Sequence, residues 1–219
     1  MTTSHSSIRS LSLDGPAGTL EALLNVGSPD ATHCALVCHP HPLFGGTMHN
    51  KVVFHAMKAL HSFGFPVLRF NFRGAGRSQG RHDEGHGEQD DVRAALQWLK
   101  AEFSLPVVFA GFSFGAAIGM RIACPDPDVR MIVSLGTPAE AEGRTYSFRF
   151  LQTCKKPKLF LSGDRDEYGP HEALEQIVAH AASPKELVFL PGDHYFAGHL
   201  DEMRMTIESW LHEQLGLRT

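Results

Sequence analysis

A serine lies between two glycines in residues 111–115, which read Gly-Phe-Ser-Phe-Gly. This G-x-S-x-G pattern is typical of a nucleophilic serine on a sharp strand-to-helix turn, where a Cβ at either glycine position would clash with the backbone. The apolar run 105–110 precedes the motif, and residues 114–122, rich in Ala, Met and Ile, follow it. Because these runs supply the required strand and helix, the sequence predicts that Ser113 is a nucleophile.

A nucleophilic serine needs a histidine to accept its proton and an acid to orient that histidine and stabilise its charged form. In proteins with this motif the chain order is serine, acid, histidine. Two predicted strands downstream, residues 158–161 and 187–190, run into loops at the same sheet edge as Ser113. We predict that Asp166 in the first loop is the acid and that His194 in the second is the base.

The same loops contain three alternatives. Asp164 directly follows Gly163, and its expected role is to cap a turn. Asp166 is favoured because a residue three positions after Gly163 has left the strand and can reach the histidine loop. Glu167 reads as a solvated helix start, and His199, the alternative base, as a surface residue entering the final helix.

Two backbone N–H groups are needed to bind the oxyanion of a tetrahedral intermediate. One is expected from Phe114, the residue after the nucleophile, and the other from the loop that follows the predicted strand 35–38. That loop, residues 39–46, reads His-Pro-His-Pro-Leu-Phe-Gly-Gly, and its prolines have no N–H. The second donor is therefore His41 or Leu43, and Leu43 is favoured.

A metal site is the competing interpretation of the fourteen histidines and four cysteines. Cys34 and Cys38 lie on a continuous apolar run and lack the second Cys/His pair of a zinc site. All four cysteines are expected to be reduced thiols, since a chain of this length has its own core. No metal or organic cofactor is expected. The histidines that a metal-dependent activity would use are His39, His41, His82 and His86.

Length and composition are those of a globular domain. The chain has 219 residues, 42% hydrophobic and 20% charged, with a net charge of -4, so we expect one domain over residues 1–219. Without a basic block or a long apolar stretch, neither nucleic acid nor membrane is an expected partner. Residues 1–7 contain no secretory signal, which predicts a cytoplasmic location. The oligomeric state, including a homodimer, is left open.

Short apolar runs alternate with amphipathic stretches along the chain. The runs predict strands, the stretches predict helices, and the alternation predicts an α/β fold with a mostly parallel sheet of about eight strands and helices on both faces. Residues 8–13 and 20–24 predict an antiparallel hairpin at the sheet edge, and residues 74–91 form the longest irregular segment. Predicted strands are 35–38, 67–70, 107–110, 131–135, 159–161 and 187–190; predicted helices contain Val53, Met57 and Leu60, then Val92, Leu96, Leu99 and Phe103, then Leu174, Ile177, Val178 and Ala181, and finally Met203, Ile207, Trp210 and Leu211.

These features together resemble the α/β-hydrolase superfamily over nearly the whole chain. The His-Pro-His-Pro of residues 39–42, the Gly-Gly-Thr-Met of 45–48, the Leu-Arg-Phe-Asn-Phe-Arg-Gly of 68–74 and the Gly-His-Gly-Glu of 85–88 are similar to a narrower group. This group comprises small lidless bacterial hydrolases described as dienelactone-hydrolase-like. The resemblance implies the triad Ser113, Asp166 and His194, in agreement with the residue-based prediction.

The sequence departs from that group in two places. Dienelactone hydrolases proper use a cysteine nucleophile, whereas this chain has Ser113, which favours a general serine esterase. Many members also have Asp where this chain has Asn71. Arg73 and Gly74 are interpreted as structural residues that tie down the loop after the strand.

A lid would be inserted in residues 137–156, and about twenty residues are too few for a cap domain. An open site is therefore expected, which would hydrolyse esters or thioesters of small acyl groups through an acyl-enzyme on Ser113. The alternatives are a binding protein on an idle scaffold and a peptidase or carbon-carbon hydrolase that uses the same triad. The expected walls are residues 41–44, Phe112, Phe114, residues 139–150, Tyr195 and Phe196.

Overall fold

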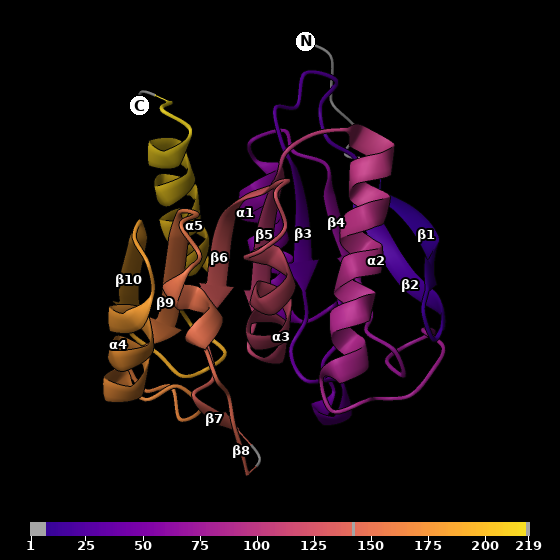
Figure 1. The fold of residues 1–219 in the computed structure, drawn as a ribbon. Helices are drawn as coiled ribbons and strands as arrows, with labels where there is room; N and C mark the ends of the chain where they lie inside the picture. Colours follow the sequence, from indigo (N-terminus) through magenta and orange to yellow (C-terminus); the bar gives the residue numbers. More distant parts are fainter. Residues whose placement is uncertain (1–7, 142, 218–219) are drawn as a thin grey trace.

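The computed structural model describes residues 8–141 and 143–217, and its centre is an eight-stranded sheet in the order β1-β2-β4-β3-β5-β6-β9-β10 (Figure 1). The hairpin strands β1 and β2 are antiparallel, and β2 pairs antiparallel with β4, whereas the other neighbours are parallel. The strands are β1 (Ile8–Gly15), β2 (Gly18–Asn25), β3 (Cys34–Cys38), β4 (Val67–Phe70), β5 (Val107–Phe112), β6 (Val129–Leu135), β9 (Lys158–Gly163) and β10 (Lys185–Leu190).

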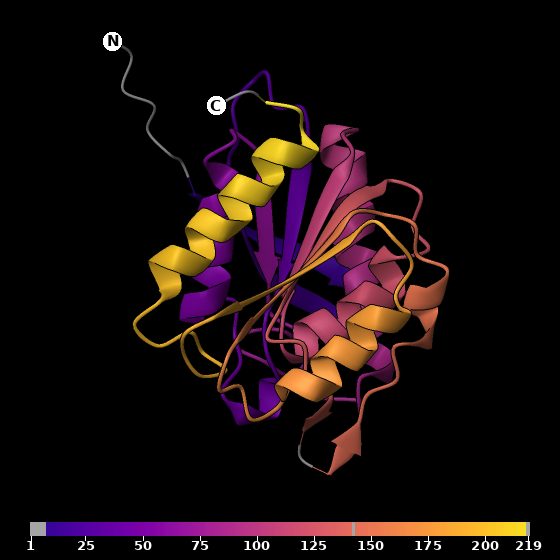
Figure 2. The same cartoon turned by 90° about the vertical axis from the view of Figure 1, so that its left-hand side faces the viewer.

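Five helices cover the two faces of the sheet, so the predicted α/β class is confirmed. One face packs against α1 and α5, and the other against α2, α3 and α4. Figure 2 shows this arrangement, with α5 in yellow and α1 in purple on one side of the sheet and α4 in orange on the other. The helices are α1 (Lys51–His61), α2 (His86–Phe103), α3 (Phe114–Ala123), α4 (His171–His180) and α5 (Leu200–Gln214). Among the described residues, no helix combines the length and apolar content that crossing a bilayer requires.

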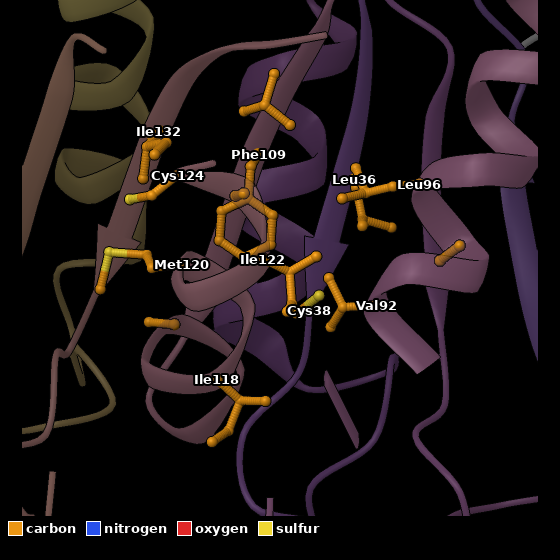
Figure 3. Close-up of a cluster of buried hydrophobic side chains, with 14 of the residues drawn as sticks. Leu36, Cys38, Val92, Leu96, Phe109, Ile118, Met120, Ile122, Cys124 and Ile132 are labelled. Atoms are coloured by element: carbon orange, nitrogen blue, oxygen red, sulfur yellow. The ribbon is translucent and has the colours of Figure 1, made fainter. Parts of the chain in front are cut away.

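The central strands are buried along their whole length, which explains their continuous apolar runs. Every residue of β3, β4, β5 and β9 is buried, as expected for parallel strands covered on both faces. On the α2–α4 side, the ring of Phe109 from β5 lies at the centre of the core (Figure 3). Around it are side chains of β3, α2, α3 and β6, namely Leu36, Val92, Ile122 and Ile132.

The segment between β6 and β9 forms a small hairpin and one turn of helix in place of a cap domain. Its strands β7 (Glu140–Ala141) and β8 (Arg144–Thr145) pair with each other, and the 3-10 helix η2 (Arg149–Gln152) follows. In Figure 1 the hairpin lies below the ends of the central strands, at the edge where β5 runs into α3. The described residues of this segment therefore form no cap domain over the strand ends.

The expectation of an irregular segment over residues 74–91 is wrong at its C-terminal end, because α2 begins at His86. The carboxylate of Glu88 accepts the N–H groups of Gly85 and Asp83, both at 2.9 Å, and so satisfies donors at the helix start. The glycines and histidines that suggested a loop are therefore compatible with a capped helix.

Arg73 has the structural role that the sequence predicts. Its guanidinium donates to both carboxylate oxygens of Asp91, with Nη2 at 2.7 Å from Oδ1, and the backbone N–H of Arg73 donates to Oδ2 at 3.0 Å. Both side chains are buried. This bidentate pair ties the loop after β4 to the first turns of α2.

Asn71 makes contacts that an aspartate could not reproduce. Its Oδ1 accepts the N–H of Met48 at 2.8 Å, and its Nδ2 donates to the carboxylate of Glu21 at 2.7 Å. An aspartate has no donor for Glu21 when ionised and would place two carboxylates in contact. The departure from the family pattern at this position is thus matched to Glu21.

Replacing Arg73 by leucine is expected to lower the free energy of unfolding by about 3–5 kcal/mol, because it leaves the Asp91 carboxylate buried and unpaired. Urea titration measures the change. The double variant R73L/D91L should recover part of the loss, since it removes both charges. Arg77→Leu is the control, because the Arg77 side chain is 91% exposed. A loss in R73L no larger than in R77L would contradict this role of the ion pair.

Candidate active site

Ser113 lies at the turn between β5 and α3, in a backbone conformation rare for a residue with a side chain. Its φ is 54° and its ψ is -119°, and its N–H donates to the carbonyl of Leu135 on β6 at 2.9 Å. A Cβ on Gly115 would lie 2.4 Å from the carbonyl oxygen of His39, and one on Gly111 would lie 2.7 Å from the Cα of Ala116. The two glycines of the motif therefore allow close backbone approach around a strained serine.

Asp166 and His194 are brought together by the loops after β9 and β10. The Nδ1 of His194 lies 2.9 Å from Oδ1 and 2.8 Å from Oδ2 of Asp166, and both side chains are buried. Asp166 also accepts from the hydroxyl of Ser162 at 2.9 Å and from the N–H groups of Tyr168 and Gly169 at 2.9 and 3.2 Å. The carboxylate is thus oriented by contacts on several sides.

The surroundings of Asp166 keep it ionised. Burial by itself raises the pKa of this carboxyl, but the hydrogen bond and charge of His194, with donors from Ser162 and Tyr168, outweigh burial and hold the pKa below its usual value. An ionised carboxylate is only an acceptor, so Nδ1 of His194 carries the proton that it donates. Nε2 is then the ring nitrogen that can accept a proton. His194 and Ser113 line the same cavity, of about 100 Å³.

The three alternative residues lie away from the contact between Asp166 and His194. Asp164 accepts the N–H of Gly192 through Oδ1 at 2.9 Å and so holds the turn after β10. Glu167 is exposed. His199 lies just before α5, with Nδ1 at 3.0 Å from the carboxylate of Glu202. The structure places Asp166, and neither Asp164 nor Glu167, against His194.

The loop after β3 forms a short 3-10 helix, and its geometry differs from the favoured expectation. The N–H of Leu43 donates to Nδ1 of His41 at 3.3 Å, and the Leu43 side chain is 65% exposed. The cavity that contains Ser113 is lined by His41 and Phe114 but not by Leu43. Of the two expected second donors, His41 is the one at the cavity. The Leu43 amide is instead hydrogen-bonded to the His41 ring, which caps the turn.

His39 anchors the start of this loop as a neutral imidazole. Its Nε2 accepts the N–H of Phe72 at 2.9 Å, and its Nδ1 is 2.6 Å from the carbonyl of Pro40, to which it donates. Burial lowers the pKa of His39 to about 4, although the Pro40 contact acts in the opposite direction. The loop is thereby joined to the end of β4 by an uncharged side chain.

The cavity walls agree in part with the expected residues. His41, Phe44, Phe114, Tyr146 and Tyr195 contribute as predicted. Phe112 and Phe196 are instead fully buried core residues, and the Phe112 ring packs 4.9 Å from the ring of His194.

Five further residues line the cavity: Pro40, Gly45 and Gly46 belong to the predicted oxyanion loop, whereas Asn50 and Tyr168 were missed from the sequence. Asn50 precedes α1 and caps it, so its residue type and position in the sequence indicate a helix cap and give no sign of its place at the cavity. Tyr168 could have been found from its place two residues after Asp166.

Three of the four histidines of the competing metal interpretation contact other residues. Both ring nitrogens of His39 are hydrogen-bonded, and the ring of His41 lies 4.8 Å from that of His82. Nδ1 of His82 lies 2.8 Å from the carboxylate of Glu88. The four cysteines are free and buried, and burial raises the pKa of Cys34 to about 12. Within the described ranges, no group of three or more His, Cys, Asp or Glu side chains is arranged to hold a metal ion.

The chain belongs to the α/β-hydrolase family, since the family model described as "Alpha/beta hydrolase domain" matches residues 35–213. A solved α/β serine hydrolase homologue from Coxiella burnetii is 38% identical, with a TM-score of 0.83 and coverage of 95% of this chain and 97% of that chain. A serine hydrolase of this fold without a lid, from Xanthomonas campestris, is 33% identical, with a TM-score of 0.83 and coverage of 98% and 96%. An uncharacterized protein of Rickettsia prowazekii is 34% identical in an alignment 209 residues long, which covers 90% of this chain and 86% of that protein. The predicted superfamily is confirmed.

The neutral state of His39 predicts a loss of stability in mild acid. The unfolded chain binds a proton at this side chain below its usual pKa of about 6.5, whereas the folded chain binds one only near 4. The free energy of unfolding should therefore fall by about 3 kcal/mol from this group as the pH drops from about 6.5 to 4. The lowered pKa of Asp166 also stabilises the fold. That contribution is lost only below this pH window, when the carboxylate becomes protonated.

Urea titrations at several pH values measure this loss in the wild type and in His39→Gln, which can both donate and accept but does not titrate. The variant should lose less stability over the same window. His33 and His55 are half-buried, and their pKa values are also lowered, chiefly by desolvation; they are common to both proteins and cancel in the comparison. Equal losses in the two proteins would contradict the assignment.

Proposed function

We propose that this α/β hydrolase is a serine esterase that cleaves esters or thioesters of small acyl groups through an acyl-enzyme on Ser113. The single observation that carries the proposal is the buried Asp166–His194 hydrogen bond beside a strained serine, with Ser113 and His194 lining one cavity. The similarity to proteins described as serine hydrolases supports hydrolase activity. The four free thiols support the predicted cytoplasmic location.

In the proposed acylation, Nε2 of His194 takes the proton from the Ser113 hydroxyl as Oγ attacks the carbonyl carbon of the substrate. The carbonyl oxygen becomes an oxyanion, bound by the N–H groups of Phe114 and His41. Asp166 stabilises the imidazolium of His194 without taking its proton. When the tetrahedral intermediate collapses, the bond to the leaving oxygen or sulfur breaks, and that atom receives the proton from Nε2.

Deacylation repeats these steps with water as the nucleophile. His194 accepts a proton from the water, the hydroxide adds to the acyl carbonyl, and the carboxylic acid leaves as Ser113 Oγ regains its proton. The chain's own residues thus supply the nucleophile, the base and the oxyanion donors. A cavity of about 100 Å³ with aromatic walls fits a small acyl group at the reacting carbonyl.

A fluorophosphonate probe tests whether Ser113 is activated. The wild type is expected to gain the mass of one phosphonyl adduct, and Ser113→Ala is expected to gain none, because the probe reacts with a serine deprotonated by its histidine. Intact-mass spectrometry measures both. An unlabelled wild type with a normal unfolding transition would overturn the esterase proposal and favour a binding protein on an idle scaffold.

Asp166→Asn tests the acid separately from the nucleophile. An asparagine keeps the shape but can hold His194 in the wrong tautomer, so kcat for p-nitrophenyl acetate should fall by about 10⁴-fold. Glu167→Gln, one residue away and exposed, is the matched control and should stay within about twofold. Steady-state kinetics measure both variants. Similar small effects in D166N and E167Q would remove Asp166 from the proposed triad.

A further inference from the structure

A second cavity lies next to the proposed catalytic cavity, on the side of the sheet covered by α4. Its volume is about 320 Å³, roughly three times that of the first. We call it the α4 cavity. Its described lining comes from the segment after β6 and from α4, and consists of Ala139, Thr145, Tyr146, Phe148, Arg149, Gln152, Ala173, Gln176, Ile177 and His180.

The α4 cavity has an apolar floor and a polar mouth. Tyr146 and Phe148 are buried in the core cluster of this face, and Ala173 and Ile177 are half-buried. The helix contributes its lining residues at positions i, i+3, i+4 and i+7, which form one continuous stripe along α4. The polar residues of the lining are exposed, namely Thr145, Arg149, Gln152, Gln176 and His180. An aliphatic chain would fit this distribution.

A short hydrogen-bonded unit lies at the border between the two cavities. Tyr146 lines both of them. The N–H of Tyr146 donates to the carbonyl of Ala139 at 3.0 Å, and the N–H of Ala139 donates to the carbonyl of Tyr168 at 2.8 Å. Because Tyr168 lines the catalytic cavity and Ala139 the α4 cavity, this short hydrogen-bonded unit is the partition between them, and the two cavities meet at Tyr146.

The side on which the α4 cavity lies indicates which part of the substrate would enter it. His194 must protonate the leaving group, and its ring packs against Phe112, which belongs to the core on the α1 and α5 face. The described lining of the α4 cavity belongs to the opposite face and includes no residue of the His194 loop. If the leaving group departs on the Phe112 side of His194, the acyl chain extends in the other direction, past Tyr168 and Tyr146.

We infer that the α4 cavity binds the aliphatic acyl chain of the substrate, so that medium-chain acyl esters or thioesters are the preferred class. This inference rests on the proposed esterase function and extends its acyl group from the few carbons that the catalytic cavity holds to a medium-length chain. The carbonyl and the first carbons of the acyl group occupy the catalytic cavity, and the remaining methylenes contact Tyr146, Ala173 and Ile177. Each methylene removed from water there strengthens binding of the transition state.

Ala173→Trp fills the α4 cavity, and p-nitrophenyl acetate and octanoate, which share one leaving group, report the effect. For A173W, kcat/KM with octanoate should fall by at least about tenfold, because the chain loses its pocket. With acetate it should stay within about twofold. Ala179→Trp is the matched control, since Ala179 is exposed on the same helix and outside the cavity lining. Equal changes for both esters, or none for octanoate, would overturn the inference.

A second ester series tests the choice of acyl chain over alcohol. Acetate esters of ethanol and octanol should respond to A173W by the same factor, because the alcohol does not enter the α4 cavity. A selective loss with octyl acetate would overturn the acyl assignment. If the wild type, A173W and A179W all hydrolyse p-nitrophenyl acetate, the esterase proposal holds whatever the result for chain length.

Binding of octanoate gives a readout that does not need turnover. In Ser113→Ala, octanoate should raise the melting temperature, and the rise should be lost in S113A/A173W but kept in S113A/A179W. The same pattern would support the α4 cavity as a binding site even if no ester were hydrolysed. No rise in S113A, or an equal rise in all three proteins, would overturn the inference.

Discussion

The close approach of the start of α3 to the loop after β3 is the constraint on which the site depends. Because residue 115 has no side chain, the helix backbone can lie against the carbonyl of His39, where a Cβ would be 2.4 Å away. This contact places the Phe114 amide and the His41 loop at one cavity beside Ser113. The strained φ of Ser113 is kept by the buried strands on either side, since its N–H is already hydrogen-bonded to Leu135 of β6.

The loop that carries Asp166, the proposed acid, also builds the cavity wall. Asp166 is held by the backbone N–H groups of Tyr168 and Gly169, so the turn that fixes the carboxylate also fixes Tyr168. The Tyr168 ring packs 4.6 Å from the ring of His194, and its carbonyl accepts the N–H of Ala139. The geometry of the proposed triad and the position of the partition between the cavities are therefore set by one turn.

The sequence predicts best what depends on short-range patterns. The buried strands, the G-x-S-x-G turn and the positions of Asp166 and His194 follow from apolar runs and from the rule that parallel strands end at one edge. Prediction from the sequence fails where a tertiary contact determines the local structure. The start of α2 depends on Glu88 capping two amides, and the Leu43 amide is drawn to the His41 ring within a turn that the residue types alone did not specify. Asn50 lines the cavity only because α1 begins beside the loop after β3.

Because the described residues between β6 and β9 form no cap domain, the proposed control of substrate specificity lies in this short segment itself. In the segment between β6 and β9, the buried ring of Tyr146 borders both cavities, and its amide is tied through Ala139 to the acid loop. A wall fixed by backbone hydrogen bonds need not close over the substrate to select it. The α4 side of that wall, where Ala173 and Ile177 contribute only side-chain volume, can therefore vary without moving Asp166 or His194. In the proposed esterase, chain-length preference and catalysis are thus assigned to adjacent parts of the same sheet edge, which are joined through Ala139 and Tyr168.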